Sequence, residues 1–325
     1  MNEKQKKNLM WQLPLLTLLV VGTILIIRQQ HVEPTSYQHH NGFIFSTVYS
    51  VTYQYDKNLQ AEIEAKLQEV DNELSMFNNT STIARINRGE DVVESAMYSE
   101  VYELAQIVNR ETGGAFDITI APLVNAWGFG FKHEQMPTSE QVDSLLKIRN
   151  QYDFSAIAKG YATEVVARLL RSYGIENFMV EIGGELVTQG LSEKHLPWKV
   201  GVTKPTDDSL SVSTELQTVL NVTDISLATS GNYRKFYYKD GKKYAHTIDP
   251  NTGYPVQHSL LSATVLAKNC ALADAYATAF MVMGVERAKI LLERHPELMA
   301  YFIYAKPDGT NGVWFSPSLQ DKIAE

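Results

Sequence analysis

The spacing of apolar residues changes within the first quarter of the chain, and this change sets the fold class. Residues 43–55 alternate apolar and polar side chains, which is typical of a β-strand with one buried face. Residues 59–74 then place their apolar side chains three or four positions apart, which predicts an amphipathic helix. Strand and helix patterns continue to the C-terminus without strict alternation, so we predict an α+β fold with mixed sheets and packed helices.

The remaining elements are predicted from the same periodicities and from their end signals. A threonine and a glutamine at Thr138 and Gln141 form a capping-box pattern at the start of one helix. We expect helices near residues 98–112, 138–150, 160–173, 272–283 and 285–294. We expect strands near residues 178–182, 185–188, 199–202, 214–220, 224–228 and 261–266, with hairpin turns at Asp240-Gly241 and Asp308-Gly309.

The N-terminus differs in kind from the rest of the chain. Lys4, Lys6 and Lys7 precede an apolar stretch from Leu9 to Ile27, which Arg28 closes. About 19 residues of helix span about 28 Å, close to the hydrocarbon thickness of a bilayer. The lysines favour a cytoplasmic N-terminus, and no small-residue cleavage site follows the stretch. The sequence therefore predicts one uncleaved transmembrane helix, a signal anchor.

This anchor predicts the organisation of the whole chain. We expect residues 1–30 to form a cytoplasmic basic tail and a membrane span, and residues 31–41 to form a polar tether. The pair His39-His40 in this tether could bind a metal ion, but in a flexible linker it is more often solvated. Residues 42–325 form one large domain. We expect a single-pass protein of the inner (cytoplasmic) membrane, with its domain on the periplasmic side.

The net charge argues against one kind of partner, and the cysteine count excludes one kind of covalent bond. The formal net charge of -8 argues against a nucleic-acid partner, because phosphate binding needs a basic surface. Cys270 is the only cysteine, so the chain forms no intramolecular disulfide, and such a cysteine is usually buried.

The stretch 113–130 contains several glycines and aromatic residues, and Asp117 is its only charged residue. Glycines allow close backbone approach, and Phe116, Trp127 and Phe129 can present flat apolar faces. One interpretation is a pocket for a planar aromatic ligand with a polar edge. The alternative is an aromatic satellite core beneath a long loop.

Two segments carry residues suited to a metal ion and a phosphate group. Asp274 and Thr278 lie four positions apart on one predicted helix face, and a carboxylate with a hydroxyl suits Mg²⁺. The alternative is a hydrogen bond in the core. Residues 155–161 lead into a predicted helix, where free backbone amides attract anions and Lys159 adds a mobile positive charge. The alternative is an ordinary exposed helix start.

A third segment offers a proton-transfer group. His246 stands between a predicted strand and a turn set by Pro250 and Gly253. Histidine changes its charge near neutral pH, so this position suits general acid–base catalysis. The alternative is a histidine with a structural role.

Taken in order, several short segments of the chain closely resemble the FAD:protein FMN transferase (ApbE) family. The resemblance covers residues 42 to the C-terminus. The segments are Leu74–Asn87, Gly114–Thr119, Pro122–Gly130, Asp153–Tyr161, Val180–Glu185, Ala228–Gly231, His246–Pro250 and Ala273–Ala275.

The resemblance implies a fold, a reaction and a partner. The fold is a mixed α+β architecture related to the tunnelling fold, with FAD in a cleft. The enzyme splits the pyrophosphate of FAD, attaches FMN through a phosphoester to a Ser or Thr of an exported flavoprotein subunit, and releases AMP. Two alternatives stay open: an Mg²⁺-dependent FAD pyrophosphatase giving FMN and AMP, and a flavin-binding protein without turnover.

The resemblance also implies which residues form the site. It places the flavin ring against Phe45, Phe77, Ala115, Phe116 and Asp117. It places the diphosphate and adenine side against Ser155 and Tyr161, beside Lys159 and the backbone of Ile248. It assigns Mg²⁺ to the Ala158 carbonyl and to the side chains of Asp274 and Thr278, and it makes His246 the essential histidine, as a base or as a group that polarises the hydroxyl.

Two positions depart from the family pattern. Phe45-Ser46-Thr47 stands where Met-Gly-Thr is typical, which puts close backbone approach at Ser46 in doubt. Phe77 replaces the more usual Tyr or Trp, so it keeps an aromatic face and loses the polar tip.

Overall fold

The structure is a computed structural model that describes residues 35–129, 136–148, 150–205, 215–232, 236–239 and 242–324, together with residues 14, 17, 18, 20 and 21. The chain forms two compact units, residues 1–36 and residues 37–325. The predicted span Leu9–Ile27 lies almost entirely outside the described residues. Among the residues that are described, no helix combines the length and the apolar character needed to cross a bilayer.

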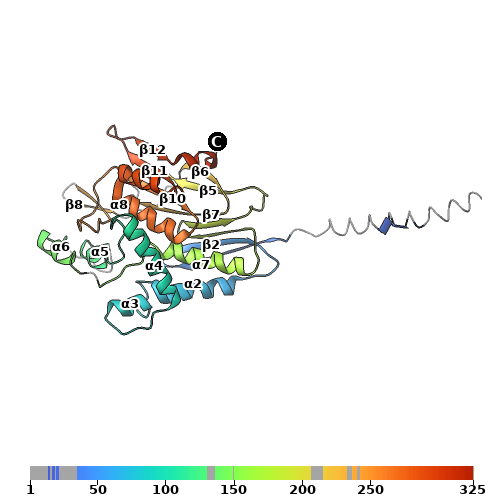
Figure 1. The fold of residues 1–325 in the computed structure, drawn as a ribbon, viewed down its shortest axis with the longest axis horizontal. Helices are drawn as coiled ribbons and strands as arrows, with labels where there is room; N and C mark the ends of the chain where they lie inside the picture. The colour runs from blue at the N-terminus through green and yellow to red at the C-terminus, as the bar shows by residue number, and fades with distance from the viewer. Residues whose placement is uncertain are drawn as a thin grey trace, which may run out of the picture. The chain divides into compact units, whose positions relative to one another are not determined.

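An antiparallel sheet of eight strands is the centre of unit 37–325 (Figure 1). Its strand order is β1-β2-β3-β4-β7-β10-β11-β12. These strands are β1 (Tyr37–Ile44), β2 (Thr47–Gln54), β3 (Phe178–Ile182), β4 (Glu185–Gln189), β7 (Ile225–Gly231), β10 (Leu260–Ala267), β11 (Met299–Ala305) and β12 (Asn311–Phe315).

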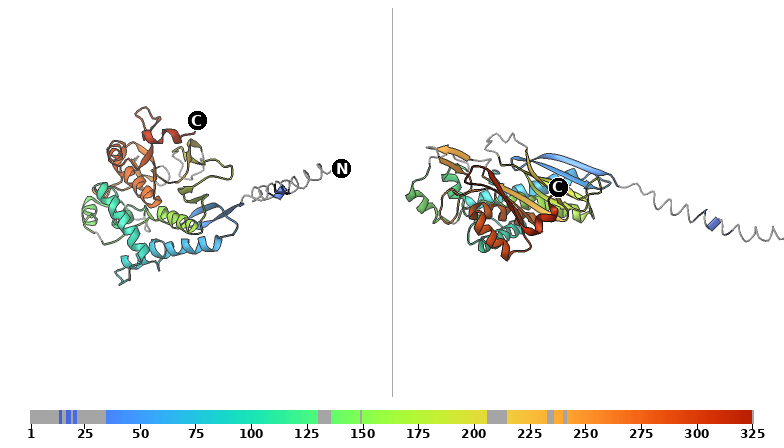
Figure 2. Two further views of the ribbon diagram at one scale, coloured as in Figure 1. Left: turned by 45° about the vertical axis from the view of Figure 1, so that its right-hand side comes forward. Right: turned by 90° about the horizontal axis from the view of Figure 1, so that it is seen from above.

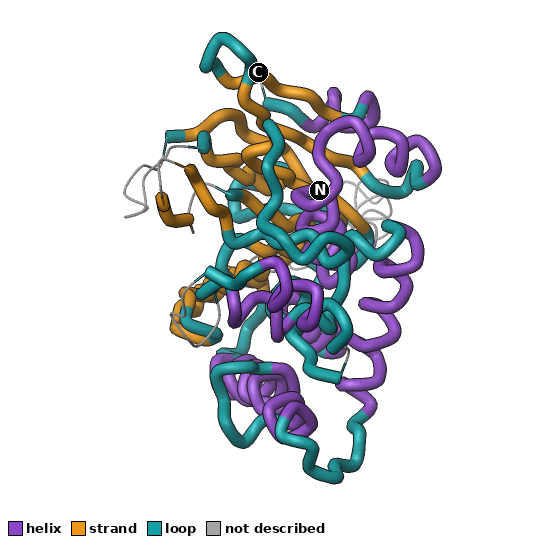
Figure 3. Tube along the Cα trace, turned by 90° about the vertical axis from the view of Figure 1, so that its left-hand side faces the viewer, coloured by secondary structure: helices purple, strands orange, loops and turns teal. Residues whose placement is uncertain are grey.

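Helices cover one face of this sheet. The helices of the described chain are α2 (Gln60–Leu74), α3 (Thr82–Asn87), α4 (Ala96–Glu111), α5 (Ala121–Ala126), α6 (Ser139–Leu145), α7 (Ala158–Ser172) and α8 (Cys270–Arg294), with a 3₁₀ turn η1 (Pro317–Lys322). α7 packs against β3 and β4, and α8 packs against β7 and β10. Figures 2 and 3 show the strands gathered in a layer beside the long helices. Alanines such as Ala228 and Ala263 face α8, so the helix can lie close to the strands.

A smaller two-stranded sheet covers part of the opposite face. β5 (Trp198–Thr203) pairs with β6 (Leu216–Val222), and their apolar side chains pack on outward residues of the large sheet such as Leu227 and Leu266. A second small hairpin pairs β8 (Phe236–Lys239) with β9 (Lys242–Ala245). The predicted turn Asp240-Gly241 of that hairpin lies outside the described residues. The mixed helices and sheets confirm the predicted α+β class.

The predicted single strand over residues 43–55 is wrong in one respect, because this range crosses a hairpin turn from the end of β1 into β2. β1 and β2 pair along their whole length and turn at Phe45 and Ser46, whose φ values are 49° and 59°. A two-residue hairpin turn with positive φ at both positions is usually signalled by Asn or Gly, which this turn lacks. The hairpin was therefore not evident in the sequence.

The predicted tether over residues 31–41 is also wrong from Tyr37 onward. β1 begins at Tyr37, and unit 37–325 includes it. His40 is buried, and its Nε2 lies 2.9 Å from the Tyr53 hydroxyl. His39 Nδ1 lies 3.1 Å from the Thr52 hydroxyl of the neighbouring strand. The two histidines are therefore part of the sheet.

The helix α8 is kinked at the position where the sequence predicts a break between two helices. α8 contains Gly284 at φ 75° and ψ 173°, a conformation outside the helical region that suits glycine. His258 Nε2 lies 2.8 Å from the Met281 carbonyl, which the interruption deprives of a helical partner. The kink matches the expected break between residues 283 and 285. The capping box of Thr138 and Gln141 is likewise present.

Candidate functional site

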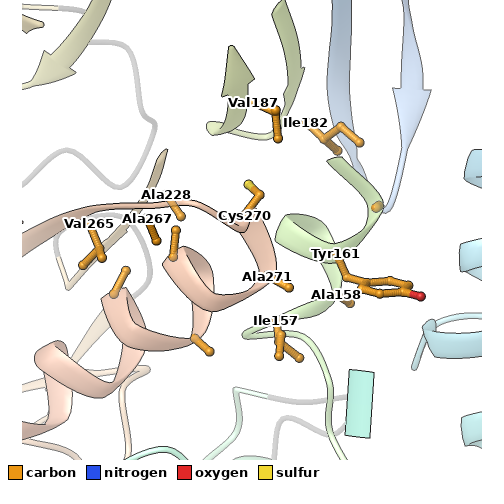
Figure 4. Close-up of a cluster of buried hydrophobic side chains, with 14 of the residues drawn as sticks. Ile157, Ala158, Tyr161, Ile182, Val187, Ala228, Val265, Ala267, Cys270 and Ala271 are labelled. Atoms are coloured by element: carbon orange, nitrogen blue, oxygen red, sulfur yellow. The ribbon is translucent and has the colours of Figure 1, made fainter. Parts of the chain in front are cut away.

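The first turn of α7 lies directly against the first turns of α8. The backbone N–H of Gly160 donates to Oδ2 of Asp274 over 3.0 Å. A Cβ atom on Gly160 would lie 2.3 Å from the Cys270 carbonyl oxygen, so only glycine allows this approach. Figure 4 shows Ala158 of α7, and Ile157 just before it, close to Ala271 of α8. The segment 155–161 and Asp274, predicted separately from the sequence, therefore meet.

Thr278 lies one helical turn beyond Asp274 and contacts the sheet. Its hydroxyl lies 3.1 Å from the hydroxyl of Ser230 on β7. Asp274 is 3% exposed and Thr278 is partly exposed. Together they bring a carboxylate and a hydroxyl to a junction of helices and sheet, and the first turn of α7, which begins at Ala158, meets α8 at Asp274.

These oxygen donors fit a magnesium ion. Within the described residues no group of three or more His, Cys, Asp or Glu side chains could hold a metal ion. An ion at Asp274 would therefore need hydroxyl, carbonyl, phosphate or water oxygens as well, which is the usual environment of Mg²⁺. Burial raises the pKa of the Asp274 carboxyl, and the Lys159 ammonium and the Gly160 N–H oppose this rise. A bound cation would favour the charged carboxylate further.

Lys159 differs from its prediction as a mobile positive charge. Its ammonium is held in an ion pair and hydrogen bond with Oε1 of Glu185, the first residue of β4. Glu185 is 2% exposed, and its Oε2 is buried and forms no hydrogen bond with the residues that the structure describes. Burial raises the pKa of Glu185, while the neighbouring ammonium opposes this. The positive charge thus stays beside the site in a fixed position.

The aromatic stretch supplies mainly core. Phe116 is 3% exposed and belongs to the large hydrophobic core, as does Ile118, and Ala115 between Gly114 and Phe116 is also buried. Trp127 is buried with Leu123 in a separate small cluster, and its Nε1 donates to the Gly253 carbonyl over 2.8 Å. The alternative interpretation, a small aromatic core beneath a loop, is therefore correct for Trp127. The rings of Phe116 and Trp127 are both buried and do not face a ligand in this structure.

The partly exposed Phe129 lies near His246. Their ring centroids are 6.4 Å apart, in an edge-to-face arrangement. His246 follows β9 directly, as predicted, and precedes a turn closed by the Gly253 N–H, which donates to the Asp249 carbonyl over 2.7 Å. Ile248 is buried in the small cluster with Trp127. The stretch 113–130 and the His246 segment are therefore joined through one apolar cluster.

Hydrogen bonds fix the backbone around Asp117. Oδ1 of Asp117 accepts from the N–H and the hydroxyl of Thr119, over 2.8 and 2.7 Å. The Asn109 side chain donates to the Phe116 carbonyl over 2.7 Å. Residues 115–117 thus offer a rigid backbone and a partly exposed carboxylate to any ligand beside them.

The other predicted contact residues fall into two groups. Phe77 is 67% exposed, Phe45 is partly exposed at the hairpin turn, and Ser155 is exposed with its N–H donating to the Asp153 carboxylate over 2.8 Å. Tyr161 is 2% exposed, and its hydroxyl donates to Oε2 of Glu100 over 2.7 Å. Figure 4 shows its ring directed away from α8. The side chain of Tyr161 is therefore part of the core and does not line a binding surface.

Three contacts of the site were not anticipated. Ser230 binds Thr278, Glu185 binds Lys159, and Gly160 binds Asp274. Each joins residues more than 20 positions apart, so no local spacing could reveal them. The sequence indicated these partners only indirectly, because Glu185 and Ser230 lie in the segments Val180–Glu185 and Ala228–Gly231, which resemble the family.

Comparison with known proteins finds relatives and solved structures that are named flavin transferases. The model of the ApbE family matches residues 45–302. A curated FAD:protein FMN transferase of Vibrio cholerae is 37% identical over 298 residues, covering 82% of this chain and 88% of the relative. The Escherichia coli K12 protein of the same name is 34% identical over 290 residues, covering 81% of each chain.

Solved structures agree in fold. The flavin transferase ApbE from Vibrio cholerae superimposes with a TM-score of 0.79 at 33% identity, covering 89% of this chain and all of the other. The apo form of the Pseudomonas stutzeri flavinyl transferase ApbE gives a TM-score of 0.78 at 28% identity, covering 90% and 98%. This chain belongs to the ApbE family.

Proposed function

We propose that this chain is a Mg²⁺-dependent FAD:protein FMN transferase. Its family membership and its relatives' names support the transfer of FMN from FAD. The observation that carries the metal assignment is the Gly160–Asp274 hydrogen bond of 3.0 Å, which brings a helix N-terminus to a buried carboxylate. Helix N-termini attract phosphate groups, and carboxylates bind the cations that accompany them.

The reaction balances with the acceptor hydroxyl as nucleophile. Its oxygen bonds to the FMN-side phosphorus of FAD, the bond from that phosphorus to the bridging oxygen breaks, and AMP leaves with the bridging oxygen. A magnesium ion bound there would neutralise negative charge on the diphosphate. Asp274, Thr278 and the Ala158 carbonyl would hold this ion, and the first turn of α7 would orient the diphosphate.

His246 is the proposed acceptor of the hydroxyl proton. It is partly exposed and lies between β9 and a hydrogen-bonded turn, so its ring can meet an incoming acceptor chain. Imidazole takes up a proton near neutral pH, which is what the attacking Ser or Thr hydroxyl requires. The exposed Phe77, the partly exposed Phe45 and the backbone of residues 115–117 are proposed to contact the flavin ring.

We propose the place of the reaction from the N-terminal sequence. Residues 9–27 are apolar and follow three lysines, which favours a single membrane anchor with the domain on the extracytoplasmic side. The acceptor would then be an exported flavoprotein subunit that carries the target Ser or Thr.

Mass spectrometry of an acceptor tests this function. The protein is incubated with FAD, Mg²⁺ and a purified exported flavoprotein domain, and the acceptor mass and released AMP are measured. Transfer adds one FMN phosphoester to the acceptor and releases one AMP for each FMN added. Free FMN with an unmodified acceptor would instead indicate an FAD pyrophosphatase. Intact FAD would leave only a flavin-binding protein, and activity that survives EDTA would contradict the metal assignment.

A further inference from the structure

Three charged side chains meet between α7, α8 and β4. Lys159 bonds to Oε1 of Glu185, while the residue after Lys159 donates its N–H to Oδ2 of Asp274. The Lys159 ammonium also attracts the Asp274 carboxylate electrostatically. One cation therefore lies within the influence of two buried carboxylates, and it is hydrogen-bonded to only one of them.

The surroundings of the Glu185 Oε2 atom show where this carboxylate lies. Oε2 is buried and lacks a hydrogen-bond partner within the described part of the chain. It lies 3.4 Å from the position that a Cβ atom on Gly183 would take, beside the Thr47 side chain at the start of β2. Glu185 thus lies beside the β3–β4 turn and the start of β2, at the first position of a strand of the large sheet.

The choice of partner by Lys159 has a consequence for cation binding. An ammonium on the Asp274 carboxylate would occupy an oxygen that a divalent ion needs, and it would repel that ion. An ammonium held by Glu185 leaves the Asp274 oxygens to the Gly160 N–H and to the ion. Glu185 would thus act on the site through Lys159, as outer partners of metal ligands commonly do.

We propose that Glu185 is a positioning residue: it binds the Lys159 ammonium on the β4 side, and thereby keeps the Asp274 carboxylate available to a divalent cation. This inference rests on the proposed metal site at Asp274. It concerns neither a ligand of the ion nor a group that touches the reacting atoms.

Calorimetric titration of Mg²⁺ into the FAD-saturated protein, without acceptor, tests this inference. Glu185→Gln keeps the shape of the side chain and removes its charge, so Lys159 turns to Asp274. We expect Mg²⁺ affinity to fall roughly 10- to 100-fold, the range found when outer partners of metal ligands are removed. Lys159→Met combined with Glu185→Gln removes the competing cation as well, and should restore affinity to within about threefold of the wild type.

The control breaks a different ion pair of α7. Glu100→Gln removes the partner of Arg168 and Tyr161 without touching Lys159, and should bind Mg²⁺ like the wild type. Wild-type affinity in Glu185→Gln would overturn the inference and leave the metal site intact. A double variant as weak as Glu185→Gln would also overturn it, because a purely structural role of Glu185 predicts no rescue. Absence of Mg²⁺ binding in the wild type would overturn both the inference and the proposed metal site.

Discussion

Gly160 and Asp274 are 114 positions apart in the chain and are joined by a 3.0 Å hydrogen bond from the glycine N–H to the carboxylate. The bond exists because α7 and α8 approach at Gly160 without a side chain between them. A helix start and a buried carboxylate are thereby held together, and the proposed reaction depends on this contact.

Replacing Gly160 with alanine should therefore disrupt the site. The new Cβ would lie 2.3 Å from the Cys270 carbonyl oxygen and 2.7 Å from Cβ of Asp274. Overpacking of this kind costs about 1–3 kcal/mol of unfolding free energy, measurable by urea denaturation. Gly174→Ala is the control, because a Cβ there meets nothing and only the positive φ of 73° is strained. Equal stability of Gly160→Ala and the wild type would contradict the close approach.

Two substitutions at Asp274 should separate its charge from its hydrogen bond. Asp274→Asn and Asp274→Ala both remove the carboxylate, so both should lose Mg²⁺-dependent release of AMP. Asn can still accept from the Gly160 N–H, whereas Ala leaves this buried donor unpaired, at a cost of about 1–3 kcal/mol in stability. AMP release and thermal unfolding are measured together on each variant. Full activity of either variant would disprove the metal assignment.

His246→Ala should slow FMN transfer without weakening FAD binding. A positioned proton acceptor typically contributes a factor of about 10²–10⁴ in rate. Transfer is followed by the acceptor mass, and FAD affinity by quenching of flavin fluorescence. His195→Ala, at an exposed position in the β4–β5 connection, is the matched control. An unchanged transfer rate in His246→Ala would exclude this histidine as the base.

Ser46→Gly should stabilise the β1–β2 hairpin. Ser46 adopts φ 59°, a region in which a Cβ atom costs about 1–2 kcal/mol and glycine has no such cost. Part of this gain is lost to the greater freedom of glycine in the unfolded chain. We expect a higher melting temperature for Ser46→Gly. Ser50→Gly, within β2, should lower it; a lower value for both variants would contradict the turn conformation.

The stability of the domain should decrease in mild acid through His258. Burial lowers the pKa of His258, while its bonds to backbone carbonyls oppose this. Because the pKa is lower in the folded state, the unfolded chain takes up the proton first. The stabilising contribution is present above about pH 6.5 and is lost as the pH falls below that value.

His258→Gln tests this titration, since glutamine can still donate to the Met281 carbonyl and does not ionise. The melting temperature of this variant should fall less steeply than that of the wild type between about pH 7 and about pH 5. His40, whose pKa burial also lowers, contributes equally to both proteins. Identical slopes for the two proteins would contradict the assignment.

Local patterns predicted the longer helices and most strands, because the apolar spacing of these elements can be read from neighbouring residues. The stripe on α2 and the break at Gly284 are examples. The short helices α3 and α5 were missed. The turn at Phe45 and Ser46 was missed because neither residue is a usual turn former at positive φ. The tether was predicted too long because β1 reads as polar at its start, being an edge strand with exposed positions.

The sequence suggested individual residues of the candidate site, but it did not suggest which of these residues contact one another. Asp274, Thr278 and the 155–161 segment were identified from their chemistry and from the family resemblance. Their partners Ser230 and Glu185 come from distant strands, and only the fold decides that these meet α8 and α7. Tyr161 shows the converse: its position in the motif suggested ligand contact, whereas packing against α4 turned its side chain inward.

The break in α8 at Gly284 separates two tasks within one continuous helix. Asp274 and Thr278 lie before it, and the partly exposed turns that lead to Arg294 lie after it. Because His258 binds the Met281 carbonyl at the end of the first part, we expect substitutions beyond the break to leave the proposed metal ligands in place. Homologous chains could therefore diversify that outer stretch, for instance to suit different neighbours, while leaving the ligand geometry unaltered.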